Sequence, residues 1–243
     1  MSFWPLPPAV LPPVEQSVHV WAIKLDDHSI DLARARELIS ADERERAERF
    51  RFERDRRSYL IAHVALHGIL GRYLPAESGR LSFAYGSNGK PRLGPELAPA
   101  GLRFNLSHSN ELALLTITRA GEIGVDVEFV KENFEFHDIA EKFFTAREVA
   151  AMRSLPVELQ RRAFFKCWTS KEAFLKAKGT GLSGNLDEVE IAFRSGQGIQ
   201  ITADVPGWSL TELNPIDGYE AAIVVEGPSL QIRYFGWEPH LPG

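Results

Sequence analysis

An internal repeat constrains the fold of this chain more than any other feature of its sequence. Two capping-box motifs, Ser40-Ala41-x-Glu43 and Thr145-Ala146-x-Glu148, lie 105 positions apart (145 − 40 = 105). At the same offset lie paired arginines and alternating apolar residues: Arg56-Arg57 with Arg161-Arg162, and 18–22 with 123–127. A capping box marks the start of a helix. Because one offset is kept through strand, helix start and helix, the pattern indicates a duplication.

The duplication predicts an α+β fold with pseudo-twofold symmetry. Each of two similar lobes should consist of a small antiparallel sheet packed on a long helix, with a ligand cleft between the lobes. The predicted divisions are a proline-rich arm at 1–16, an N-terminal lobe at 17–118 and a C-terminal lobe at 119–243. Apolar and β-branched runs predict strands, and the helical spacing of apolar residues predicts two long helices. The predicted strands are 18–25, 112–118, 123–128, 220–225 and 230–235, the last two antiparallel, and the predicted long helices are 56–73 and 161–178.

Composition excludes several classes of partner. A net charge of −5 gives no overall attraction to nucleic acid or to an anionic membrane. The single cysteine, Cys167, suits a reducing compartment. No apolar run is long enough to span a bilayer, and the N-terminus lacks the pattern of a signal peptide. We therefore expect a cytoplasmic protein that binds neither nucleic acid nor membrane.

The predicted strand at 123–128 carries a candidate metal site. Val125 and Val127 alternate with Asp126 and Glu128, so the two carboxylates project from the same face. Mg²⁺ is usually held by one or two protein carboxylates together with water and substrate phosphates. The sequence therefore favours either a magnesium site for a phosphate-bearing ligand or, more simply, a half-exposed strand with an acidic outer face.

The long helix at 161–178 carries a second polar group. Trp168, Glu172 and Lys176 are four residues apart and share one helix face. One interpretation is a surface Glu–Lys pair, worth a few tenths of a kcal/mol. Because Trp168 places this line at the edge of the apolar face, the other interpretation is a partly desolvated pair at a ligand site.

Five blocks of sequence resemble one known family. They are Gly-Lys-Pro at 89–91, Asn-Leu-Ser-His-Ser at 105–109, Gly-Val-Asp-Val-Glu at 124–128, Phe-Phe-Thr-Ala-Arg-Glu at 143–148 and Trp-Thr-Ser-Lys-Glu-Ala at 168–173. Their order, followed by Lys176, resembles the surfactin-type (Sfp-like) class of 4′-phosphopantetheinyl transferases. That class has two similar α+β lobes on a single chain, so the resemblance implies a monomer.

The resemblance implies a reaction and its participants. A serine of an apo carrier protein (acyl, peptidyl or aryl) would attack coenzyme A, become esterified with 4′-phosphopantetheine and release 3′,5′-ADP in a Mg²⁺-dependent step. Asp126, Glu128 and Glu172 would bind Mg²⁺, and Glu172, Lys176 and Asp126 would be the catalytic residues, with Glu172 accepting the serine proton.

The resemblance also implies contacts to coenzyme A. Lys176 and Lys171 would contact its pyrophosphate, and the nucleotide end with its 3′-phosphate would meet Lys90, Ser107 and His108. Arg46 and Arg57 match basic phosphate contacts, although Ser58 stands where the family tends to place an arginine. Glu148 matches a family acid without an assigned role.

Two other functions stay open on the residues alone. One is a Mg²⁺-dependent hydrolase of pyrophosphates or nucleotides, which would use the same carboxylates with water as the nucleophile. The other is a non-catalytic module that binds coenzyme A or a carrier protein.

Overall fold

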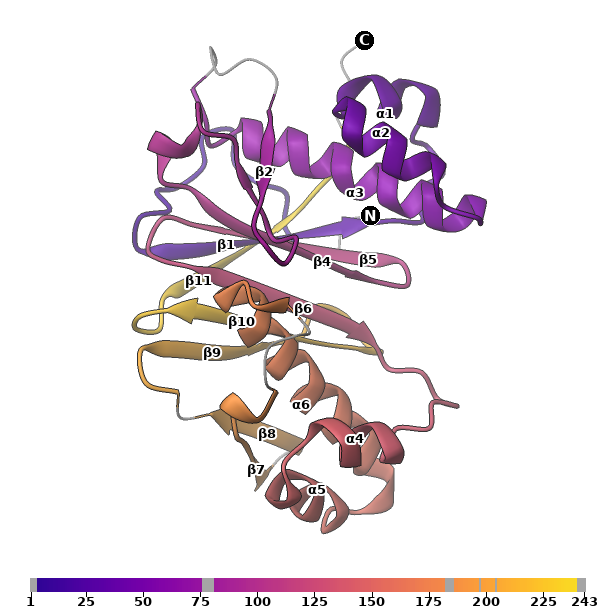
Figure 1. Cartoon of the computed structure of the whole chain (residues 1–243), viewed down its shortest axis with the longest axis vertical. Coiled ribbons are helices and arrows are strands. Elements are labelled where there is room, and N and C mark those ends of the chain that lie inside the picture. Colours follow the sequence, from indigo (N-terminus) through magenta and orange to yellow (C-terminus); the bar gives the residue numbers. More distant parts are fainter. Residues whose placement is uncertain (1–3, 76–80, 182–185, 197, 204, 240–243) are drawn as a thin grey trace.

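The computed structural model describes residues 4–75, 81–181, 186–196, 198–203 and 205–239. Its elements form four stacked layers, with helices on the outside and two sheets face to face in the middle (Figure 1). This arrangement follows from strands that are apolar on both faces: one face of each sheet packs on helices and the other packs on the opposite sheet.

The N-terminal part of the chain builds one helix layer and most of one sheet. Its elements are β1 (Ser17–Lys24), α1 (Leu32–Leu38), α2 (Ala41–Glu48), α3 (Glu53–Gly71), β2 (Phe83–Tyr85), β3 (Pro91–Leu93), a 3-10 turn at Ala98–Ala100, β4 (Arg103–Ser109) and β5 (Leu112–Thr118). The C-terminal part builds the other sheet and helix layer. Its elements are β6 (Ile123–Phe129), α4 (His137–Phe143), α5 (Ala146–Arg153), α6 (Val157–Lys178), a 3-10 turn at Leu186–Glu188, β7 (Ile191–Gly196), β8 (Gly198–Ala203), β9 (Trp208–Leu213), β10 (Tyr219–Glu226) and β11 (Gln231–Gly236).

The predicted duplication is confirmed in three dimensions. Helices α1 and α4, helices α2 and α5, and strands β4 and β9 begin 105 residues apart. The strand order β1-β5-β4 in the first sheet matches β6-β10-β9 in the second. Both predicted capping boxes are formed, with Ser40 and Thr145 at the N-caps of α2 and α5. The predicted α+β fold with two similar halves is therefore correct, and each long helix begins about a turn earlier than predicted.

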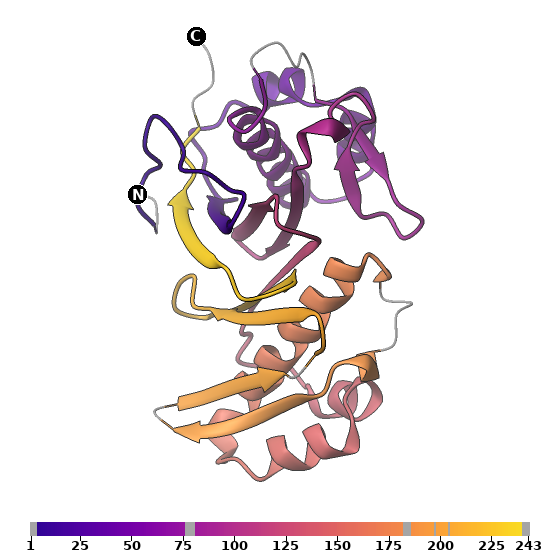
Figure 2. The ribbon, with the colours of Figure 1, turned by 90° about the vertical axis from the view of Figure 1, so that its left-hand side faces the viewer.

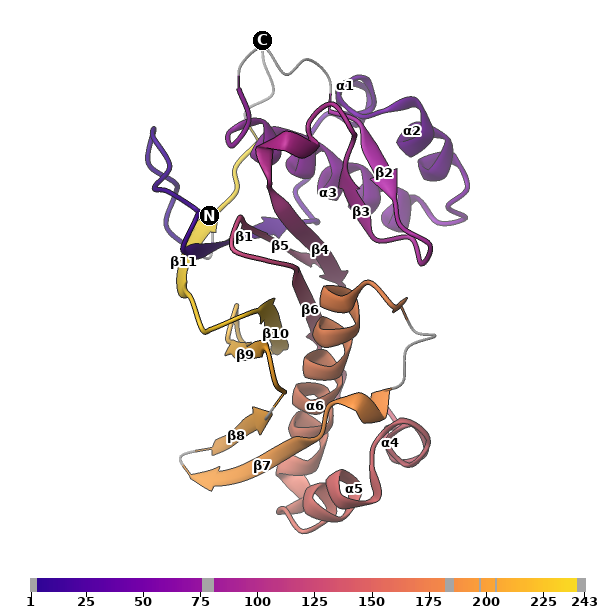
Figure 3. The same cartoon turned by 60° about the vertical axis from the view of Figure 1, so that its left-hand side comes forward.

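Strand β11 departs from the prediction. It was expected to be antiparallel, but it pairs with β1 in parallel, with Trp21 opposite Phe235. Figures 2 and 3 show it leaving the C-terminal half and running up the edge of the N-terminal sheet. Alternation of apolar residues reveals a strand but not the direction of its partner, and so the sequence could not decide this pairing. The lobe boundaries at residues 17 and 119 stay a prediction.

The proline-rich arm lies against this edge. Residues 4–16 form neither helix nor strand, as the five prolines in 1–16 predicted. The backbone N–H of Gly236 donates to the carbonyl of Pro5 at 2.8 Å, and the Arg72 side chain donates to the carbonyl of Pro8 at 2.7 Å. Within the described ranges no helix is long and apolar enough to cross a membrane.

Candidate active site

Close packing of α6 on β6 creates the site. Gly124 lies directly beneath the helix, where an added Cβ would come within 2.1 Å of the Ala173 carbonyl oxygen and 2.4 Å of the Ala177 nitrogen. Only glycine permits so close an approach. Figure 3 shows α6 running along β6 from the outer end of the C-terminal half to the junction with the N-terminal sheet. The last turns of α6 are thereby brought against Asp126, two residues beyond Gly124.

A three-way contact joins the two halves at this junction. The Lys176 Nζ lies 2.6 Å from Asp126 Oδ1 and 2.8 Å from Ser107 Oγ, and the Ser107 hydroxyl donates to the same carboxylate oxygen at 2.9 Å. Asp126 comes from β6, Lys176 from α6 and Ser107 from β4 of the N-terminal sheet. The sequence-predicted residues Asp126, Lys176 and Ser107 therefore meet, and they do so between the halves.

Two further carboxylates belong to the same cluster. Glu128 accepts a hydrogen bond from Ser109 Oγ at 2.7 Å, and Glu172 is buried one turn before Lys176. Burial and the charge of nearby Asp126 raise the pKa of both Glu128 and Glu172, while Lys176 opposes this shift. The three acids therefore influence one another in a poorly solvated place, where Asp126 pairs with Lys176.

Two buried carboxylate oxygens of the cluster bear on whether it could hold a cation. Asp126 Oδ2 and Glu172 Oε1 are buried and have no hydrogen-bond partner. Buried polar atoms normally have a partner, so each such exception calls for an explanation. No ready-made group of three His, Cys, Asp or Glu ligands occurs in the part of the chain that the structure describes. The donor set fits Mg²⁺, which takes one or two carboxylates and completes its shell with water and phosphate.

His108 follows Ser107 on β4 and is exposed to solvent. Because side chains alternate along a strand, it does not share the face from which Ser107 and Ser109 contact Asp126 and Glu128.

Lys90 does not join the cluster as a free ligand. Its Nζ donates to Glu122 Oε2 at 2.9 Å and to the backbone carbonyls of Ile123 and Ala177 at 3.0 and 2.9 Å. An ammonium group has three donors, and all three are used. Lys90 therefore ties the β2–β3 hairpin to the start of β6 and the end of α6, whereas the family resemblance implied a contact to the nucleotide end of coenzyme A.

Lys171 points away from the cluster. Its Nζ lies 2.8 Å from Glu148 Oε1 and donates to the carbonyls of Leu186 and Val189. Both charged side chains are almost completely buried. Five residues along a helix turn the side-chain direction by roughly 140°, so Lys171 and Lys176 face opposite sides of α6. Glu148, whose role the sequence left open, closes the capping box of α5 and neutralises Lys171.

The two candidate arginines lie on the N-terminal helices. Arg46 on α2 is exposed and stands over the Tyr85 ring, 4.6 Å from its centroid. The Arg57 guanidinium donates to the carbonyls of Asp27 and Ile30. Within the described residues neither arginine contacts Asp126, Glu172 or Lys176, so the structure brings neither into the central cluster.

The sequence did not reveal a second buried charge cluster, in the N-terminal half. The two carboxylate oxygens of Glu43 are hydrogen-bonded to two histidines of α3, at 2.7 Å from His63 Nδ1 and 2.8 Å from His67 Nε2. The spacing of four residues between the histidines indicated only a helix face. The repeat contained the missing signal, because Glu43 is the counterpart of the buried Glu148. Ser109 was also missed, although its two-residue spacing from Ser107 mirrors that of Glu128 from Asp126.

The fold and the site together define a class: a duplicated α+β protein whose halves meet at a carboxylate–lysine cluster suited to a magnesium-bound phosphate compound. Comparison with known proteins gives the family. Residues 122–224 match the model of the 4′-phosphopantetheinyl transferase superfamily, and residues 26–119 match the model described as 4′-phosphopantetheinyl transferase, N-terminal.

Curated relatives agree with these matches. The chain is 40% identical over 236 residues to the 4′-phosphopantetheinyl transferase HetI of Nostoc sp., covering 97% of this chain and 96% of the relative. It is 29% identical to the 4′-phosphopantetheinyl transferase Sfp of Bacillus subtilis over 69% of this chain and 71% of the relative. A crystal structure of Thermotoga maritima holo-[acyl-carrier-protein] synthase matches 46% of this chain and 64% of its own, with 25% identity and a TM-score of 0.33.

The chain belongs to the 4′-phosphopantetheinyl transferase superfamily, in its Sfp type. This confirms the resemblance noted in the sequence, and with it the prediction of an enzyme of the transferase class.

Proposed function

We propose that this protein transfers 4′-phosphopantetheine from coenzyme A to a serine of an apo carrier protein at the Asp126–Lys176 cluster, with Mg²⁺ bound there. The observation that supports this placement is the pair of buried, unpaired oxygens on Asp126 and Glu172, next to the Lys176 ammonium. Family membership supports the reaction itself and does not favour the hydrolase or the non-catalytic module.

Asp126, Glu128 and Glu172 are the residues that would hold the metal. A bound Mg²⁺ would supply positive charge at the pyrophosphate. Phosphoryl transfer is accelerated mainly by positioning and by neutralising the negative charge of the phosphate oxygens. Lys176 adds a second positive charge on the same side. Ser107 contacts both Asp126 and Lys176, so it positions the proposed metal ligand and the lysine relative to each other.

Glu172 is the proposed proton acceptor. A new P–O bond forms to the carrier serine, the bond to the 5′-phosphate of 3′,5′-ADP breaks, and the serine proton passes to Glu172. The raised pKa of Glu172 brings its carboxylate closer to the working pH, which suits a general base. His108, next to Ser107 on β4, is the proposed contact for the nucleotide end of coenzyme A.

The geometry changes the roles proposed for two lysines. Lys90 and Lys171 have their donors bound to carboxylates and carbonyls, so we assign both to holding the fold and not to coenzyme A. Arg46, which is exposed on α2, is kept as a phosphate contact, and Arg57 as a weaker one. We further propose that the protein works as a cytoplasmic monomer with coenzyme A and an apo carrier protein as its partners.

The test is the intact mass of an apo carrier protein after incubation with this protein, coenzyme A and Mg²⁺, with EDTA as the control. We expect a gain of one phosphopantetheine that EDTA abolishes. The Lys176→Gln variant should lose most of this activity. Its matched control is Lys178→Gln on the same helix, because Lys178 pairs with Glu188 outside the cluster. Consumption of coenzyme A without any gain in carrier mass would support the hydrolase instead.

A further inference from the structure

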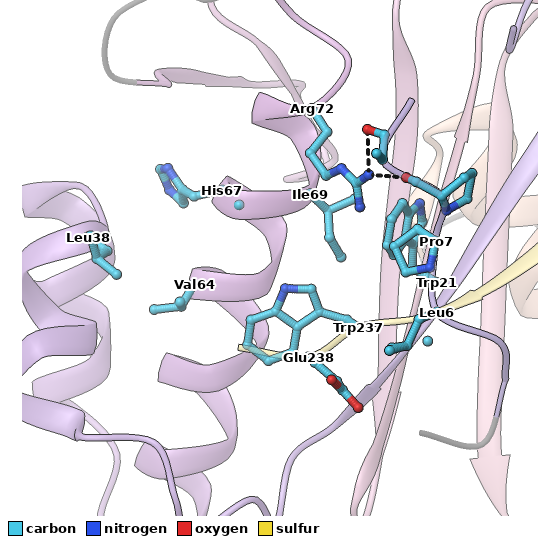
Figure 4. Close-up of a pocket in the computed structure, with 14 residues that line it drawn as sticks. Leu6, Pro7, Trp21, Leu38, Val64, His67, Ile69, Arg72, Trp237 and Glu238 are labelled. Carbon is cyan, nitrogen blue, oxygen red and sulfur yellow. Dashed lines mark hydrogen bonds between the residues drawn. The ribbon is translucent and has the colours of Figure 1, made fainter. Parts of the chain in front are cut away.

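A second cavity lies in the N-terminal half, away from the proposed active site. Its volume is about 680 Å³, within the usual range for small-molecule sites. It is enclosed by α3, the segment that follows β11, and the N-terminal arm (Figure 4). None of the residues of the Asp126–Lys176 cluster lines it.

The duplication relates this cavity to the active site. At the offset of 105 residues, Trp21 of β1 corresponds to Asp126 of β6, and His67 of α3 corresponds to Glu172 of α6. Both Trp21 and His67 line the cavity. Each first strand also has a further strand beside it: β11 pairs with β1 in parallel, and β4 places Ser107 and Ser109 against Asp126 and Glu128. The place between first strand and long helix is therefore acidic in one half and holds an indole and an imidazole in the other.

The walls of the cavity are flat and apolar. Trp237 and Leu38 present an indole ring and aliphatic surface to the cavity, and the buried side chains of Trp21, Val64 and Ile69 form its floor (Figure 4). The Trp21 indole N–H donates to Tyr73 Oη at 2.8 Å, so its one polar atom is already bound. Aromatic side chains favour aromatic ligands through stacked and edge-to-face contacts in addition to the area that they bury.

The polar groups around the cavity are either occupied or balanced in charge. Arg72 lies over the Trp21 ring, 5.5 Å from its centroid, and donates to the carbonyl of Pro8 at 2.7 Å. His67 is held by Glu43 through Nε2. The positive charge of Arg72 is matched by the negative charge of Glu238, which also lines the cavity. A charged ligand would gain no net attraction here and would lose its hydration.

We propose that this cavity is a binding site for a neutral, flat aromatic molecule. By the repeat it lies at the place that Asp126 and Glu172 occupy in the C-terminal half, with Trp21 and His67 at the corresponding positions. The site is separate from the transfer reaction, so its occupancy does not depend on coenzyme A or on a metal.

The probe for the test is N-phenylnaphthylamine, a neutral fluorophore that brightens in apolar sites. Anilinonaphthalene sulfonate, the same skeleton with one negative charge, is the matched charged probe. Gly68 on α3 lines the cavity, and a Cβ added there would meet only Trp237 Nε1, at 4.0 Å. Gly68→Leu should therefore fill the cavity without a backbone clash. Gly71→Leu is the control, because a Cβ at Gly71 meets nothing within 4 Å and Gly71 does not line the cavity.

We expect saturable binding of the neutral probe to the wild type and to Gly71→Leu, and binding weakened about tenfold or more in Gly68→Leu, a loss of about 1.4 kcal/mol or more. Indole should displace the probe, and hexanol should do so less well. Transferase activity of Gly68→Leu should match the wild type, which also shows that the variant is folded. Absence of saturable binding, or equal binding to both glycine variants, overturns the site. Tighter binding of the sulfonate, or equal displacement by hexanol, overturns the neutral aromatic class of ligand.

Discussion

Replacement of Gly124 by alanine tests the argument that close packing of α6 on β6 builds the active site. The new Cβ would lie 2.1 Å from the Ala173 carbonyl oxygen, whereas ordinary contact begins at 3.4 Å. The helix must therefore move away by about 1.3 Å (3.4 − 2.1 Å). Both clashing neighbours belong to the α6 backbone, so no side-chain rotation can relieve the overlap.

Two consequences follow from this displacement. Overpacking in a dense core costs typically about 1–3 kcal/mol, so the free energy of unfolding should fall by that amount or more. The shift also separates Lys176 and Glu172 from Asp126, and a misplacement of about 1 Å can cost roughly 10²-fold in rate. We therefore expect turnover to fall about 100-fold even at temperatures where the variant is fully folded.

The assay combines urea unfolding with the carrier-mass assay under saturating coenzyme A and Mg²⁺. Gly71→Ala is the matched control, because that glycine has open space around its Cβ position and should be neutral or slightly stabilising. An unchanged unfolding midpoint together with turnover within a factor of two of the wild type would refute the close-packing argument.

Three other perturbations test separate parts of the structure. Lys171→Met leaves the buried Glu148 carboxylate without its partner and should cost about 3–5 kcal/mol in urea unfolding, whereas the Lys171→Met/Glu148→Gln pair should recover part of it. Burial lowers the pKa of His19 from 6.5 to about 4. The stability that the neutral imidazole contributes is therefore complete above pH 6.5 and is lost as the pH falls toward 4, by about 3 kcal/mol in all. In His19→Phe the free energy of unfolding should depend less on pH over this range, and an unchanged dependence would contradict the assignment. The pKa of Glu172 is raised, so without metal the protein should lose stability as the pH rises above the usual carboxyl range. Mg²⁺ should restore that stability in thermal unfolding, and Glu172→Gln should weaken both effects.

Much of the architecture could be predicted from local rules. The capping boxes at Ser40 and Thr145 mark helix starts through contacts that span only three residues. The alternation of Val125 and Val127 with Asp126 and Glu128 places the carboxylates on one face of β6, because side chains alternate in every strand. The repeat offset then extended these local signals to a two-lobed fold.

The contacts of individual lysines could not be predicted in this way. Lys171 and Lys176 lie on one helix and resemble each other in sequence, but one binds Glu148 and the other Asp126. The resemblance placed Lys90 at coenzyme A, but its ammonium is bound to Glu122 and to carbonyls of β6 and α6. Which side of a helix faces which strand depends on long-range packing, and no local pattern records it.

The sequence by itself therefore determined the family, the duplicated α+β fold and the acidic face of β6. Only the tertiary structure decided that the Asp126 cluster lies between the halves with two oxygens unpaired, that β11 returns to the N-terminal sheet, and that the corresponding crevice around Trp21 is an apolar cavity. The physical reason is that periodicity and capping act over a few residues, whereas burial and electrostatics depend on residues that only folding brings together.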